Sequence, residues 1–98
     1  MEAQKDPAQY EKMAEVLKAL AHPVRLCIVH NLLHNGGCNV GHMQECLGVS
    51  QSLTSQHLSK LKAAGILRAE RRGKEIEYCV DNDIAEAVIN ALICKNNP

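Results

Sequence analysis

The chain has 98 residues, of which 46% are hydrophobic, and its 11 basic and 11 acidic side chains give a formal net charge of zero at pH 7. This length fits one domain with a small core, so association into a dimer is expected to add buried surface. The apolar fraction excludes a disordered chain, and no apolar run approaches the roughly 20 residues that span a bilayer. Because neither Phe nor Trp occurs, the core must be aliphatic.

Charge is distributed unevenly along the chain. The segment from Lys60 to Lys74 contains six bases and one acid, so it carries +5 while the remainder carries −5. A basic face on an acidic body is typical of proteins that bind nucleic acid.

The cysteines indicate a reducing environment. There are five, at Cys27, Cys38, Cys46, Cys79 and Cys94. Their number is odd, and the polar, acidic start MEAQKDPAQYEK is unlike a signal peptide. We therefore expect a cytoplasmic protein with free thiols rather than a disulfide framework.

Two helices are predicted at the N-terminal end. Asp6 followed by Pro7 is a strong helix start, and apolar residues at helical spacing continue this helix to about Ala21. Pro23 suits the first turn of a second helix, from Val24 to about His34. Its apolar residues surround most of the circumference, which predicts a central, buried helix.

The next two helices are expected to form a helix-turn-helix over residues 39–64. A short helix from Asn39 to Leu47 precedes a tight turn at Gly48. The following helix has Ser50 as its expected N-cap and Gly65 as its C′ glycine. From Val49 to Gly65 it contains many hydroxyl and amide groups and no acid. Such side chains suit phosphates and base edges.

A basic hairpin is predicted at residues 66–80. A strand from Ile66 to about Arg71 leads to a tip at Arg72-Gly73, and the return strand runs from Glu75 to Val80 with alternating apolar and polar side chains. A hairpin placed directly after a recognition helix is a wing, which can lay basic side chains along the phosphate backbone.

The last predicted helix is capped by Asp81 or Asp83 and runs to about Cys94. The fold class is therefore α+β and mainly helical: a winged helix-turn-helix with the order α-α-α-α-β-β-α, in a single domain over residues 1–98. A domain this small cannot cover both terminal helices. We expect residues 7–21 and 82–94 to pair with a second copy, giving a homodimer.

The segments LKALAHPVRLCIVHNLL and CLGVSQSLTSQHLSKLKAAGILRAERRGKEIEY resemble the ArsR/SmtB family of bacterial winged-helix repressors. The match spans nearly the whole chain, and each part has the right spacing from the next. The resemblance implies a homodimer that binds double-stranded operator DNA and releases it when an effector binds. It places the recognition positions at Ser50, Gln51, Ser52, Thr54, Ser55, Gln56 and His57.

Side-chain chemistry divides the work among the DNA-binding residues. Gln51 and Gln56 can form bidentate contacts to adenine, whereas the hydroxyls and Lys60 suit phosphate. In the wing, Arg71, Arg72 and Lys74 are expected to add salt-dependent affinity.

The effector site departs from the family's familiar metal patterns. Asn39 and Gly41 occupy the positions of a family Cys-x-Cys pair, and the last helix lacks the His of a second family site. A different ligand set, Cys38, His42 and Cys46, has spacings of four and would suit a metal or metalloid ion as effector. The alternative is that Cys46 is a small core residue. No cofactor is expected to be required for DNA binding.

A thiol trigger is the other expected effector mechanism. One branch of the family senses oxidants or reactive sulfur through a cysteine in the second helix and one in the last. Cys27 and Cys94 lie on those two elements, although His30 stands where the first thiol is expected.

Two other classes of function fit the sequence less well. A winged-helix module that binds protein favours a neutral or acidic recognition helix and wing, which is the opposite of what this chain carries. No nucleophile–base arrangement or Gly-rich phosphate loop indicates an enzyme.

Overall fold

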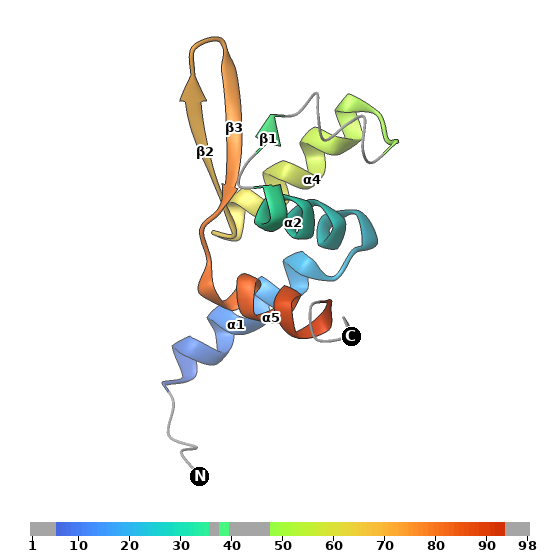
Figure 1. Cartoon of the computed structure of the whole chain (residues 1–98). Coiled ribbons are helices and arrows are strands. Elements are labelled where there is room, and N and C mark those ends of the chain that lie inside the picture. The colour runs from blue at the N-terminus through green and yellow to red at the C-terminus, as the bar shows by residue number, and fades with distance from the viewer. Residues whose placement is uncertain (1–5, 36–37, 40–47, 94–98) are drawn as a thin grey trace.

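A computed structural model describes residues 6–35, 38–39 and 48–93. The elements are α1 (Pro7–Leu20), α2 (Pro23–Asn35), β1 (Cys38–Asn39), α4 (Gln51–Ala63), β2 (Leu67–Arg72), β3 (Glu75–Val80) and α5 (Asp83–Leu92). The β2–β3 hairpin projects from one end of the molecule, α1 and α5 lie together at the other end, and α2 and α4 lie between (Figure 1). The fold is the predicted winged helix-turn-helix.

The first two helices begin at capping side chains. The Asp6 carboxylate accepts a hydrogen bond from the Ala8 amide at 3.2 Å, and Pro7 occupies the first turn of α1. At α2, His22 Nδ1 accepts from the Val24 amide at 3.1 Å, which satisfies one of the free amides of the first turn. The predicted bounds of both helices are confirmed to within one residue.

The core is aliphatic and is built around α2, which contacts α1, α4, α5 and β3. Side chains from the four helices and from the start of β2 are buried in it: Val16, Leu20, Ile28, Val29, Leu32, Leu58, Leu61, Ile66, Leu67, Ala85 and Ile89. Tyr78 and Val80 of β3 pack against this cluster from the base of the hairpin.

The hairpin has a two-residue connection. Its register pairs Leu67 with Val80 at the base and Arg72 with Glu75 at the tip. Gly73 in the connection has φ +64°, a left-handed conformation that favours glycine. The wing therefore lies where the sequence predicts it.

A third strand, β1, corrects the prediction at Asn39. Cys38 and Asn39 form β1, which pairs antiparallel with β3 opposite Tyr78 and Glu77. Asn39 is therefore extended rather than the first residue of a helix, because its backbone groups complete the open edge of β3. The rest of the predicted short helix lies outside the described residues.

The cap of α5 also differs from the prediction. The side chain of Asn82, not of Asp81 or Asp83, accepts a hydrogen bond from the Ala85 amide at 2.9 Å. The Asn82 amide also donates to the Gly65 carbonyl at 3.2 Å. This residue therefore ties the end of α4 to the start of α5.

In the described part of the chain, no single helix has the length and apolar content needed to cross a membrane. Only α1 and α2 taken together meet those two criteria, and they are bent by 100° relative to each other.

Removing a core side chain from α4 should destabilise the protein far more than removing an exposed one. Leu61 is fully buried, so Leu61→Ala should lower the free energy of unfolding by about 2–5 kcal/mol. Leu53 on the same helix is 40% exposed, and Leu53→Ala should change it by less than about 0.5 kcal/mol. Urea denaturation at one protein concentration measures both. Equal losses in the two variants would contradict this packing of α4.

Candidate nucleic-acid interface

The N-terminus of α4 is fixed by Ser50. Its hydroxyl oxygen accepts from the Leu53 amide at 3.1 Å, and its backbone carbonyl accepts from the Thr54 amide at 2.9 Å. The hydroxyl of this exposed residue can still donate its own proton, so Ser50 can cap the helix and donate to a phosphate at once. The predicted N-cap is confirmed.

The C-terminus of α4 is closed by a Schellman motif. The Gly65 amide donates to the Lys62 carbonyl at 3.0 Å, and the Ile66 amide donates to the Leu61 carbonyl at 3.0 Å. Gly65 has φ +79°, as a C′ glycine requires. The helix therefore ends sharply, and the chain turns directly into the wing.

Two faces of α4 differ completely in chemistry. The outer face carries hydroxyl, amide and basic side chains with the apolar Leu53 and Ala63. Its polar members are all exposed: Gln51, Ser52, Ser55, Gln56, Ser59, Lys60 and Lys62. The inner face, with Leu58 and Leu61, is buried against the core. An acid-free polar face held outward by a packed inner face is suited to a polyanion.

Burial corrects two of the predicted contacts. Thr54 is fully buried, and its hydroxyl donates to the Ser50 carbonyl at 2.8 Å. His57 is only 7% exposed. Both lie on the inner stripe with Leu58 and Leu61, at helical spacings of three and four, so their side chains are not available to DNA. That spacing is the sequence signal by which they can be assigned to the core.

His57 instead joins α4 to the junction of α1 and α2. Its ring lies 4.4 Å from that of His22, centroid to centroid, and its Nδ1 lies 3.2 Å from Arg25 Nη1. Burial lowers the pKa of His57 below 6.5, and the charges of His22, Arg25 and Lys60 lower it further. Since Arg25 can only donate, Nδ1 accepts its hydrogen bond, and the imidazole is held in the neutral form.

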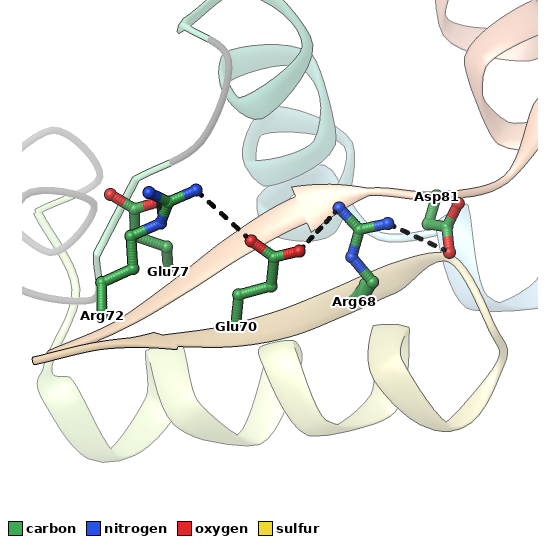
Figure 2. A network of polar contacts seen from close by, with 5 residues as sticks. All are labelled: Arg68, Glu70, Arg72, Glu77 and Asp81. Carbon is green, nitrogen blue, oxygen red and sulfur yellow. Dashed lines mark hydrogen bonds and ion pairs between the residues drawn. The ribbon is translucent and has the colours of Figure 1, made fainter.

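The wing contains a chain of ion pairs (Figure 2). Glu70 and Glu77 are directly opposite each other in the hairpin, an unfavourable pairing of like charges. Arg72 relieves it by contacting Glu70 at 3.5 Å and Glu77 at 3.0 Å. Arg68 pairs with Glu70 at 3.1 Å and with Asp81 at 3.8 Å. These three acids, of which the charge count over residues 60–74 includes only Glu70, offset most of the hairpin's positive charge.

The tip of the wing is left with uncompensated bases. Arg71 and Lys74 are exposed and form no ion pair with any other residue that the structure describes. Arg72 is exposed too, but its charge is shared by two carboxylates. Of the three predicted wing contacts, Arg71 and Lys74 are therefore the ones whose charge is free for phosphate.

The structure describes only part of the predicted effector residues. Cys27 on α2 is exposed, and Asn31 Nδ2 lies 3.3 Å from its sulfur. The predicted partner Cys94, and the candidate metal ligands His42 and Cys46, lie outside the described residues, while Cys38 is part of β1. Within residues 6–35, 38–39 and 48–93, no group of three or more His, Cys, Asp or Glu side chains is arranged to hold a metal ion.

The fold and this polar helix define a helix-turn-helix protein, and a model described as a helix-turn-helix domain matches residues 20–70. The chain is 35% identical to the transcriptional regulator YgaV of Escherichia coli, over 87% of this chain and 86% of the relative. It is 40% identical to the transcriptional repressor PagR of Bacillus anthracis, over 84% of this chain and 82% of PagR.

Two solved structures are also similar. The match to the crystal structure of PagR from Bacillus anthracis covers 89% of this chain and 99% of the PagR chain, with a TM-score of 0.84 and 38% identity. The match to reduced HlyU from Vibrio cholerae covers 93% of this chain and 95% of the HlyU chain, with a TM-score of 0.84 and 30% identity. The chain belongs to the ArsR/SmtB family of winged-helix transcriptional repressors, as its sequence predicts.

The buried His57 should make folding sensitive to mild acid. In the unfolded chain its pKa is near 6.5, and in the folded protein it is lower, so the unfolded state binds more protons between these values. Its stabilising contribution is complete above pH 6.5 and falls as the pH drops through that value. The free energy of urea unfolding should therefore decline between pH 7.5 and 5.5.

The decline should be smaller in His57→Gln, which can still accept from Arg25. His34→Gln, on the exposed end of α2, is the matched control and should behave like the parent. An identical pH dependence in the parent and in His57→Gln would contradict the assignment of this effect to His57.

Proposed function

We propose that this protein is a transcriptional repressor that binds operator DNA as a homodimer and releases it in response to an effector. The observation that carries the proposal is the outer face of α4. Its amide groups, Gln51 and Gln56, can read adenine in the major groove, and its hydroxyls can hold phosphates on either side. The wing tip extends the same surface with Arg71 and Lys74.

An exposed apolar surface on the terminal helices supports the homodimer. Tyr10 and Leu17 lie two turns apart on one face of α1 and are 47% and 49% exposed, and Leu92 of α5 is 55% exposed. Since α1 and α5 contact each other at the end remote from the wing, a second copy can cover these side chains without blocking α4 (Figure 1). A twofold axis at that end would aim two recognition helices at one duplex.

The outer face of α4 argues against a module that binds protein through this helix. A protein interface is centred on apolar and aromatic side chains, whereas the outer face of α4 offers a single exposed leucine among hydroxyls, amides and bases. The relatives are regulators of transcription rather than enzymes, in agreement with the function proposed.

Single mutations should distinguish the side chains that read bases from those that bind the phosphate backbone of DNA. Gln56→Ala should relax the preference at one base position of each half-site, by about 1–3 kcal/mol against the wrong base. Lys74→Ala should weaken binding to all sequences alike and reduce the slope of log affinity against log salt by about 1 for each phosphate that is no longer bound. Titration of a duplex selected from a random pool, at several salt concentrations, measures both effects.

Arg68→Ala is the matched control, because it removes the same charge from the base of the same hairpin. There Glu70 and Asp81 already neutralise the arginine, so the slope should change much less than with Lys74→Ala. If Gln56→Ala kept every base preference and Lys74→Ala kept the slope, this interface would be wrong.

We infer further that the trigger is a thiol. Cys27 is exposed on α2, and a disulfide with Cys94 at the end of the chain would link the core helix to the dimerisation region. Formation of this bond removes two protons and two electrons, which hydrogen peroxide accepts in becoming two molecules of water. The alternative is a metal or metalloid trigger through Cys38, His42 and Cys46.

Release of the operator should therefore depend on Cys27. Hydrogen peroxide should dissociate the complex of the parent, measured by fluorescence anisotropy, and should leave Cys27→Ser bound. Cys79→Ser, which alters a half-buried cysteine of the wing, should respond as the parent does. Full release of Cys27→Ser by peroxide would rule out this thiol, and release by zinc or arsenite alone would favour the metal alternative.

A further inference from the structure

A cleft of about 300 Å³ lies where α1, α2 and α4 meet. Each helix contributes one basic residue to its lining, namely Lys18, Arg25 and Lys60, and Glu15 is its single acid. The remaining lining residues are alanines, whose small side chains leave the cleft open. Cations therefore outnumber acids by three to one in a concave site next to the recognition helix.

Arg25 is held in this cleft by neutral groups. Its Nε donates to the Ala19 carbonyl at 2.6 Å, and its Nη1 donates to His57 Nδ1 at 3.2 Å. It is partly buried, and it forms no ion pair with a carboxylate among the residues described. The guanidinium is thus oriented by two hydrogen bonds, while its charge is compensated by neither.

A partly buried cation with neutral partners is costly unless an anion completes the site. The planar guanidinium presents further N–H donors in a fork that matches the oxygens of a phosphate, and lysines on both sides add charge without demanding a particular geometry. A carboxylate ligand would use only part of this donor set, whereas a tetrahedral oxyanion can accept from three directions at once.

We propose that the cleft formed by Lys18, Arg25 and Lys60 is a binding site for a phosphate group. The phosphate belongs either to the DNA backbone, in which case the site rests on the function proposed above and extends its footprint, or to a free phosphorylated molecule. In both cases binding is coupled to α4, because that helix contributes Lys60 to the lining of the cleft and His57 as the hydrogen-bond acceptor of Arg25.

The first arm of the test uses the full chain without DNA. Inorganic phosphate and pyrophosphate are titrated into 15N-labelled protein at constant ionic strength, and the Arg25 Nε–H and the amides of α4 are followed by NMR. A free phosphate ligand predicts saturable shifts in the parent and at least a tenfold weaker Kd in Lys18→Gln. Lys12→Gln removes an exposed lysine of α1 outside the cleft and should bind as the parent does.

The second arm measures operator affinity against salt for the same variants. A backbone phosphate in the cleft predicts no saturable shifts with the free anions, but a slope lower by about 1 per cleft in Lys18→Gln and unchanged in Lys12→Gln. Lys18 is exposed on α1, so its replacement should leave the fold intact, as the NMR spectrum would confirm.

The proposal is overturned if Lys18→Gln and Lys12→Gln behave alike in both arms. If the parent bound no DNA at all, the proposed function would fail, yet the first arm would still decide the cleft. Saturable binding of phosphate would then support a free ligand, and its absence would overturn the site.

Discussion

The orientation of α4 depends on the packing of its inner face. Leu58 and Leu61 lie in the core, and His57 accepts a hydrogen bond from Arg25, whose Nε in turn donates to the last turn of α1. Turning the helix about its axis would expose Leu61 to water and break this link between three helices. The polar outer face is therefore presented on a rigid scaffold, as a DNA-reading surface requires.

The parts of the fold that could be predicted are those set by neighbouring residues. The caps at Asp6, Ser50 and Gly65 determine where helices begin and end. The alternation of Ile76, Tyr78 and Val80 with Glu75 and Glu77 predicts β3. The predicted cap of α5 was wrong because three adjacent residues, Asp81, Asn82 and Asp83, can each cap a helix, and only the contact of Asn82 with Gly65 selects one. β1 could not be foreseen, since two extended residues gain their stability from a distant strand edge.

In the candidate site, too, the features set by neighbouring residues could be predicted, and those set by distant contacts could not. Exposure of Gln51, Gln56 and the serines follows from their place opposite a leucine stripe. Thr54 and His57 are buried although they are polar, because each has its hydrogen bond inside the fold. In the wing, the net charge of the segment overstates the positive charge that is available to DNA. The cross-strand register places Glu70 opposite Glu77, and Arg72 forms ion pairs with both (Figure 2).

The central claim is that two copies of the outer face of α4 read one duplex. Hydroxyl-radical footprinting of the protein on DNA selected from a random pool tests it most directly. Two protected half-sites with centres about one helical turn, roughly 10 base pairs, or a multiple of it apart are predicted, with opposite orientation. A single protected half-site at saturating protein, or no protection on any selected sequence, would contradict the account.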